Sequence, residues 1–328
     1  MNKMVVPSAF NQAHIDAFYD YIGFPTALRQ HQPLQDPAKD IHFLTQLHVY
    51  MIAAVPYDNL WLHYDPTHRV DITALGNFDK VVTQARGRGS YCMGNHVLLN
   101  HILRFLQYPV YLGPARTRPR IDSIPTGEFP GWVHLVNIIT LSDGQVWTMD
   151  VGFGGDGPTK PMPLAHDRPQ VNLGSQEVRL IRDWIPTQLH RTEASKLWIY
   201  EYRNGKEKPW NSFYAFSETE AMEADFHVIN HFTGTSPDSH HTVTQLLVKF
   251  LRREKEDGSG DQEIYGKRML VNATVKENLG GKTRTVEECS TEADRVRVLK
   301  EWFGIILTED EVQAITGTAT ELKIDTFE

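Results

Sequence analysis

Cysteine is nearly absent from this chain, which has only Cys92 and Cys289 among its 328 residues. Two thiols cannot build a disulfide framework, and neither lies in a CxxC pair or in a Cys/His pattern with zinc-ligand spacing. These absences exclude a disulfide-stapled secreted scaffold and a structural zinc site. We therefore expect a reducing, cytoplasmic setting, in which a free thiol persists.

Basic clusters and long apolar runs are also missing. The formal net charge is -8, and no block of lysine and arginine marks a nucleic-acid surface. No stretch approaches the roughly 18 uninterrupted apolar residues of a membrane span, and the opening residues, MNKMVVPSAF, lack the apolar centre of a signal peptide. We expect a protein that binds neither nucleic acid nor a membrane, and no pattern indicates whether it forms oligomers.

A metal site is not expected either. His240 and His241 lie close to Asp238, and the three together have the composition of a metal-binding cluster. The segment 241–253 shows the alternation of a strand, and adjacent residues of a strand point to opposite faces. The two imidazoles would then diverge, so we predict core or solvated roles for them and no metal.

The spacing of apolar residues changes twice along the chain. Helical periodicity, broken at prolines, covers 14–24, 40–55 and 97–107. The period then shortens to two, which predicts strands at 109–116, 132–141, 145–153, 177–184 and 197–203. The remaining segments are a helix at 217–232, strands at 241–253, 264–275 and 282–288, and helices at 292–305 and 308–315. This order predicts an α+β fold.

One of the two cysteines has an informative setting. Gly89 and Ser90 interrupt regular structure, and Ser90 is a good N-cap for a helix predicted over 91–107. Cys92 would lie in the first turn of that helix, where the helix dipole favours a thiolate and lowers the pKa of the thiol. A free cysteine is also a common buried core residue. The residues around Cys92 therefore leave a nucleophile and a packing role both open.

A nucleophilic thiol needs a base and a group that orients the base. His134 lies in the predicted strand GWVHLVNIITL, and the chain returns through a turn to Asp150. A two-residue Asp143-Gly144 loop would place the two side chains on opposite faces of the hairpin. A three-residue loop over 142–144 would place them on one face as diagonal neighbours. The sequence allows both registers, and a strand histidine is also often a core residue.

Five segments, in this order, resemble motifs of the arylamine N-acetyltransferase family. Arg88-Gly89-Ser90-Tyr91-Cys92 resembles the RGGYC motif that carries the cysteine of that family. The other four are Val55–Leu60, similar to IPFENL; Val133–Asn137, similar to the histidine strand; Met149–Gly154, similar to the DVGFG motif; and Thr235–Pro237, which matches a signature of the third region. The order and spacing agree over roughly residues 40 to 240.

The resemblance implies a fold and a reaction. The fold has a helical domain, residues 1–108, a β-barrel domain, 109–220, and an α/β lid, 221–328, around a core like that of papain and transglutaminases. Cys92 takes an acyl group from acyl-coenzyme A as a thioester, His134 activates the thiol, and Asp150 orients the imidazole. An arylamine or hydrazine then receives the acyl group in a ping-pong reaction. Acetyl is expected, while propionyl and malonyl remain compatible; coenzyme A enters as a substrate, and no cofactor is bound permanently.

Further residues follow from the same resemblance. Positions near the coenzyme A contacts of the family are Gly131, Phe232, Ser236 and Asp238. Candidate walls of the amine pocket are Phe129, Trp132 and Val133. We also predict that Asp58 and Arg88, each within a matching motif, form a structural ion pair that ties the first helices to the cysteine loop.

The chain departs from the family pattern beside the cysteine. Ser90 replaces the second glycine, Gly94 stands where Glu or Gln is usual, and His96 stands where Asn is usual. These changes alter the surroundings of Cys92 and so bear on rate and substrate preference. Two alternatives remain beside a transferase: a hydrolase that uses the same three residues with water as acceptor, and an arylamine-binding homologue with weakened catalysis.

Overall fold

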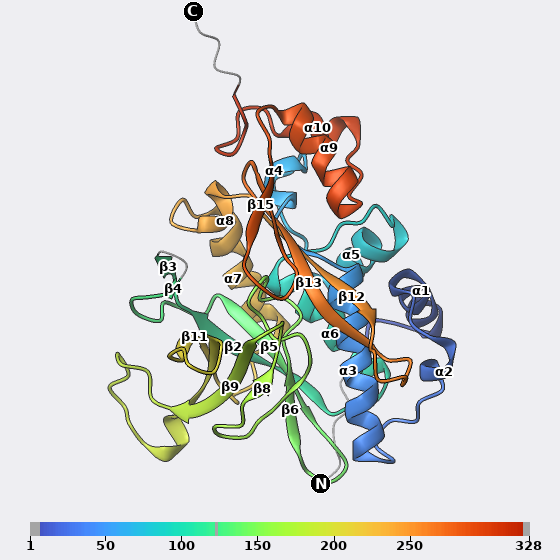
Figure 1. Ribbon diagram of the computed structural model, residues 1–328, viewed down its shortest axis with the longest axis vertical. Helices are drawn as coiled ribbons and strands as arrows, with labels where there is room; N and C mark the ends of the chain where they lie inside the picture. The colour runs from blue at the N-terminus through green and yellow to red at the C-terminus, as the bar shows by residue number, and fades with distance from the viewer. Residues whose placement is uncertain (1–6, 122–123, 324–328) are drawn as a thin grey trace, which may run out of the picture.

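The computed structural model describes residues 7–121 and 124–323 and has a mixed α/β fold (Figure 1). The first part of the chain is helical, as predicted. Its helices are α1 (Gln12–Ile22), α2 (Thr26–Arg29), α3 (Pro37–Ala54), α4 (Trp61–Tyr64), α5 (Ala74–Phe78) and α6 (Cys92–Phe105). Within the two described ranges, no helix is both long and apolar enough to cross a bilayer.

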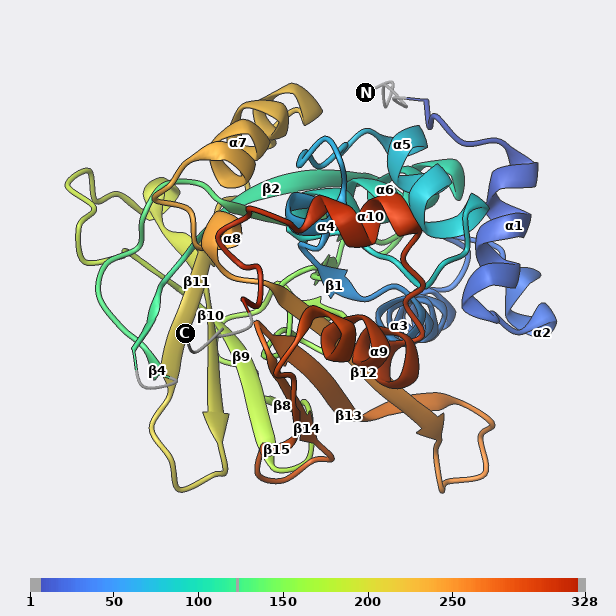
Figure 2. The same cartoon turned by 90° about the horizontal axis from the view of Figure 1, so that it is seen from above.

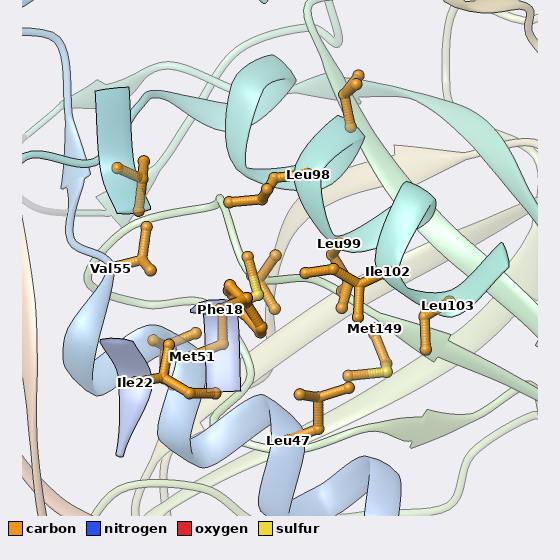
Figure 3. Packing of buried hydrophobic residues seen from close by; sticks show 14 of the residues in the cluster. Phe18, Ile22, Leu47, Met51, Val55, Leu98, Leu99, Ile102, Leu103 and Met149 are labelled. Carbon is orange, nitrogen blue, oxygen red and sulfur yellow. The ribbon is translucent and has the colours of Figure 1, made fainter. Parts of the chain in front are cut away.

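Helices α1, α3 and α6 share one apolar core. The sequence starts α3 with a strong signal, because the Asp36 carboxylate accepts hydrogen bonds from the first backbone N–H groups and Pro37 occupies the first helical position. Figure 3 shows side chains of α1, α3 and α6 packed together, with Met149 of the neighbouring sheet beside those of α6; the labelled residues are Phe18, Ile22, Leu47, Met51, Val55, Leu98, Leu99, Ile102, Leu103 and Met149. This packing holds α6 against the sheet.

The larger sheet has eight strands in the order β7-β6-β5-β2-β11-β10-β9-β8. They are β2 (Val110–Thr117), β5 (His134–Thr140), β6 (Val146–Met149), β7 (Met162–Pro163), β8 (Gln170–Val171), β9 (Gln176–Asp183), β10 (Leu197–Asn204) and β11 (Asn211–Phe216). The segment from β7 to β8 pairs with β6 at one end and with β9 at the other. The sheet is therefore curled into a half-barrel where the resemblance implied a barrel (Figure 1). A short antiparallel pair of strands, β3 (Arg120–Ile121) and β4 (Ile124–Pro125), accompanies it.

A second sheet joins the beginning of the chain to its end. Its order is β1-β12-β13-β14-β15, with β1 (Tyr57–Asp58), β12 (Leu246–Glu254), β13 (Gln262–Val271), β14 (Thr274–Asn278) and β15 (Arg284–Glu288). The remaining helices are α7 (Glu223–Thr235), α8 (His240–Val243), α9 (Glu292–Phe303) and α10 (Glu309–Ala314). Tyr57 of β1 lies opposite Val248 and also bridges to Ser90, and α10 lies beside α4 (Figure 2). The loop before α6 is thus held by the last part of the chain.

The predicted strand over 241–253 is wrong at its start. The helix α8 comes first, because the Ser239 side chain accepts a hydrogen bond from the backbone N–H of His241 and caps a single turn. The strand β12 begins only at Leu246. Polar side chains before a predicted strand served here as a helix cap, and the argument that His240 and His241 diverge as strand neighbours no longer applies.

Two other differences between the predicted and the observed strands depend on the tertiary structure. The predicted single strand over 264–275 is a hairpin, because Asn272 takes a left-handed conformation, with φ of 51°, between β13 and β14. The strand β11 was not predicted. Its last four residues are all buried, so the inside–outside alternation that marks a half-exposed strand is missing.

A loop of the larger sheet and a loop of the second sheet come into close contact at Gly174, and we expect this contact to exclude a side chain at that position. Gly174 has φ of +58°, and a Cβ there would overlap the backbone carbonyl group of Gly280. Because backbone cannot swing aside as a side chain can, Gly174→Ala should lower the free energy of unfolding by about 2 kcal/mol or more, as measured by urea denaturation. Gly281→Ala is the matched control, since a Cβ there meets nothing within 4 Å. Equal losses in both variants would contradict the prediction.

Candidate active site

The helix α6 begins at Cys92. Tyr91 is the N-cap residue, and no side chain caps this end of the helix. The prediction that Ser90 caps a helix over 91–107 is therefore wrong at the cap: the backbone N–H of Ser90 instead donates to Oδ1 of Asn95, at 3.1 Å. The prediction that Cys92 lies in the first helical turn is confirmed.

The Cys92 side chain points toward the histidine strand. The residue is 4% exposed, and Sγ makes a weak hydrogen bond, 3.6 Å long, to the backbone carbonyl of Val133. Val133 immediately precedes His134, the first residue of β5. Cys289 lies in a different apolar cluster, together with residues of α9. The fold thus brings one of the two thiols to the predicted base.

The hairpin between β5 and β6 decides whether His134 and Asp150 meet. Thr140 lies opposite Val146, and the glycine of the turn, Gly144, has φ of 85°. This is the register of the three-residue loop, which puts the histidine and the aspartate on one face. His134 Nε2 lies 2.8 Å from Asp150 Oδ2, a hydrogen-bond distance.

Asp150 has a second imidazole partner, which the sequence analysis did not identify as such. His96 Nε2 lies 3.2 Å from Asp150 Oδ1, and the backbone N–H of Gly152 donates to the same oxygen at 3.1 Å. His96, His134 and Asp150 therefore bring three potential metal-ligand atoms within 4.8 Å of one another. A hydrogen bond links His134 to the carboxylate and an ion-pair contact links His96 to it. The absence of a metal remains our prediction.

Burial dominates the ionisation of the three central groups. It raises the pKa of Cys92 to about 12, against a smaller opposite effect of the Met93 backbone N–H. It lowers the pKa of His134, while the charge of Asp150 raises it again. Burial also raises the pKa of Asp150, but the contacts with His134 and His96 outweigh it and hold that pKa below its usual range. The backbone at the helix start does lower the pKa of the thiol, as expected, but desolvation is the larger effect, so the net shift is upward and a lowered thiol pKa is not found.

Aromatic rings surround the predicted base. The rings of Phe153 and Tyr214 lie 5.2 and 5.4 Å from the ring of His134, centroid to centroid, and the ring of His96 lies at 5.3 Å. All of these contacts are edge-to-face. They leave the imidazole little water to exchange protons with, so its partners are protein groups or a bound substrate.

Three comparisons identify what this arrangement is similar to. A family model described as N-acetyltransferase matches residues 40–312. The chain belongs to the arylamine N-acetyltransferase family. It is 29% identical over 324 residues to the N-malonyltransferase FDB2 of Fusarium pseudograminearum, covering 93% of this chain and 92% of the relative.

Solved arylamine N-acetyltransferases share the fold. The enzyme from Nocardia farcinica superposes with a TM-score of 0.73 and 25% identity, covering 93% of this chain and 94% of that one. The enzyme from Mycobacterium marinum, whose structure is a complex with CoA, gives a TM-score of 0.68 and 21% identity over 93% of this chain and 96% of that one. The mixed α/β architecture is therefore that of the N-acetyltransferase family.

The family motif before the cysteine is held by buried charges. Arg88 and Asp58 are fully buried, and Arg88 Nη2 lies 3.8 Å from Asp58 Oδ1. Asp58 Oδ2 accepts a 2.6 Å hydrogen bond from the backbone N–H of Gly89. A third partner is Glu311 of α10, whose Oε1 lies 3.2 Å from Arg88 Nη1 and which also pairs with Arg86. Sequence reasoning missed Glu311, because no local pattern links α10 to a loop so far away in the chain.

Two of the departures from the family pattern share one space. A Cβ at Gly94 would overlap the side-chain oxygens of Ser90 and Asn77. The hydroxyl of Ser90 therefore occupies the room that a larger residue at position 94 would need. A family-type Glu or Gln at 94 would therefore have to displace the side chains of both Ser90 and Asn77.

The residues predicted from the family to bind coenzyme A and the amine fall into separate groups. Phe232 and Ser236 lie at the end of α7, Asp238 follows in the turn before α8, and Phe232 is 47% exposed. Gly131 lies in the loop before β5, and a Cβ there would meet nothing within 4 Å. The three pocket candidates are Trp132, under the guanidinium of Arg116; Phe129, in a small apolar cluster; and Val133, beside the thiol. Their binding roles stay predictions.

We expect the buried charges around Arg88 to be essential for stability. Arg88→Ala would leave Asp58 buried without its cation, so it should lower the free energy of unfolding by about 3–5 kcal/mol, measured by urea denaturation, and should lower activity as well. Arg253→Ala is the control, because Arg253 pairs with Glu263 on the surface, where the pair contributes about 1 kcal/mol at most. Unchanged stability of Arg88→Ala would show that the pair does not hold the loop.

Proposed function

We propose that this protein transfers an acyl group from acyl-coenzyme A to the nitrogen of an arylamine or arylhydrazine through a thioester on Cys92. The observation that carries the proposal is the 2.8 Å contact of His134 Nε2 with Asp150, next to a thiol that contacts the residue before His134. With Nε2 engaged by the carboxylate, Nδ1 is the nitrogen left to exchange a proton with the thiol. A thiol, an imidazole and an orienting carboxylate are the groups that covalent acyl transfer needs.

In the first half-reaction, Sγ of Cys92 attacks the carbonyl carbon of the donor thioester. The thiol proton passes to His134, the bond from the acyl carbon to the coenzyme A sulfur breaks, and His134 returns the proton to the departing thiolate. The base has to take this proton during the attack, because burial raises the pKa of the free thiol to about 12.

In the second half-reaction, the amine nitrogen attacks the Cys92 thioester. His134 accepts the proton that the nitrogen loses and delivers it to Sγ as the carbon–sulfur bond breaks. An arylamine nitrogen is weakly basic, so it is uncharged at neutral pH and can enter a dry site. The rings of Phe153 and Tyr214 around the imidazole favour this acceptor over water, which argues against the hydrolase alternative.

The site indicates the type of reaction more directly than it indicates which acyl group is transferred. Acetyl is the group implied by the family motifs, and the name of the Fusarium relative adds malonyl on equal terms. We further propose that the half-exposed end of α7, with Phe232, Ser236 and Asp238, and the loop at Gly131 contact coenzyme A. Phe129, Trp132 and Val133 are the proposed walls of the amine pocket.

Intact-mass spectrometry tests the thioester and the donor together. The protein is mixed with acetyl-, propionyl- or malonyl-coenzyme A, and we expect one acyl adduct that maps to Cys92 and disappears when an arylamine is added. The adduct should persist in buffer without amine, which a hydrolase would not allow. Failure of all three donors to label Cys92 would refute the proposed function.

The second cysteine supplies the control. Cys92→Ser should abolish acyl transfer, whereas Cys289→Ser should leave it near normal, because Cys289 packs against α9 in a separate cluster. Steady-state assays with one arylamine measure both variants. Equal loss in the two variants would count against Cys92 as the nucleophile.

A further inference from the structure

Both ring nitrogens of His96 face hydrogen-bond acceptors. Nδ1 lies 2.7 Å from the backbone carbonyl oxygen of Cys92, and a carbonyl can only accept, so Nδ1 carries a proton. Nε2 lies 3.2 Å from Oδ1 of Asp150, which is ionised, although the contact does not have the geometry of a hydrogen bond. A neutral ring would leave the Nε2 lone pair 3.2 Å from this negative charge, which is unfavourable.

The surroundings give the ring no alternative partner. The His96 side chain is fully buried, and Nε2 makes no hydrogen bond to any described group, Asp150 included, so its contact with the carboxylate is an ion pair at 3.2 Å. A Cβ at Gly152 would lie 2.7 Å from Nδ1, so the glycine backbone closes against the face of the ring. The imidazole is fixed between the first turn of α6 and the segment after Asp150.

We propose that His96 is a buried imidazolium and acts as a positioning residue, which holds Asp150 from the side opposite His134. The charge state rests on the geometry of the ring alone. Its consequence for acyl transfer rests on the function proposed above.

This assignment makes the activated site electrically neutral. When Cys92 has given its proton to His134, a thiolate and the Asp150 carboxylate face two imidazolium rings, and the four charges cancel. With a neutral side chain at position 96, the same state would keep one uncompensated negative charge in a buried site. Such a charge disfavours the thiolate.

The other titratable groups around Asp150 are uncharged at neutral pH and cannot substitute for His96. His48 of α3 is neutral, because burial lowers its pKa to about 4. Tyr57 of β1, Tyr200 of β10 and Tyr214 of β11 are neutral, because burial raises their pKa values well above the usual range. Among the described side chains, His134 and His96 are thus the two that compensate the carboxylate.

Nitrogen NMR tests the charge state directly. In protein labelled with 15N-histidine, the His96 signals are those lost in His96→Asn, and we expect both ring nitrogens to show protonated chemical shifts at pH 7. A signal typical of an unprotonated ring nitrogen would overturn the proposal. The charge state is read in the unmodified protein, and His96→Gln assigns the same signals if His96→Asn folds poorly.

The effect on the thiol is measured by alkylation. In a Cys289→Ser background, the rate of Cys92 alkylation by iodoacetamide is followed against pH, with intact mass as the readout. Loss of the imidazolium removes a positive charge that favours the thiolate, so at each pH between about 7 and 9 His96→Asn should slow the alkylation of Cys92 by about tenfold or more.

His101→Asn is the matched control. His101 also lies on α6 and also contacts a carboxylate, with Nε2 2.9 Å from Glu223, but it is remote from Asp150. The alkylation rate of Cys92 should be unchanged in His101→Asn. If His96→Asn, shown by thermal melting to be folded, alkylates at the unchanged rate, or if His101→Asn slows the reaction equally, the positioning role is wrong.

The two proposals fail separately. A protonated His96 with no acyl adduct on Cys92 would refute the transferase function and keep the charge assignment. An acyl adduct on Cys92 together with a neutral His96 would refute the charge assignment and keep the transferase function.

Discussion

The negative charge of Asp150 is the constraint on which the site depends. A carboxylate removed from water costs several kcal/mol unless charge and hydrogen bonds compensate it. Here the compensation comes from two directions, from His134 on β5 and from His96 on α6, with the backbone of Gly152 as a third contact. The same carboxylate therefore fixes the orientation of the helix that carries Cys92 relative to the curled sheet. Packing of α6 against α1, α3 and Met149 supports this arrangement from the other side (Figure 3).

The loop before α6 contains residues that depart from the family motif, and side chains of neighbouring segments hold its backbone. The backbone of Gly89 is held by Asp58, and Ser90 by the side chain of Asn95. Within this frame, the hydroxyl of Ser90 fills the space above Gly94. A larger residue at position 94 would have to displace the side chains of both Ser90 and Asn77, so the departures at 90 and 94 share one crowded space.

Sequence reasoning succeeded where the determining contacts are local. The helices around the core follow from apolar spacing and from caps such as Asp36. The meeting of His134 and Asp150 depends on one hairpin loop, and a three-residue loop with a left-handed Gly144 was among the two alternatives that the sequence allowed. Sequence reasoning failed where contacts between distant parts of the chain determine the outcome. The strand β11 is buried too evenly to show alternation, and desolvation raises the pKa of Cys92 more than the helix start lowers it.

The long reach of Glu311 has a consequence for the order in which the chain is made. The residue follows Arg88 by 223 positions and belongs to the last helix that the structure describes. A ribosome releases the cysteine loop long before the carboxylate that neutralises its arginines. Until α10 emerges, Arg86 and Arg88 lack this partner and the loop lacks its final support. The Cys92 loop is thus synthesised well before the carboxylate that supports it, so an incomplete chain carries the thiol on a loop whose arginines lack this partner.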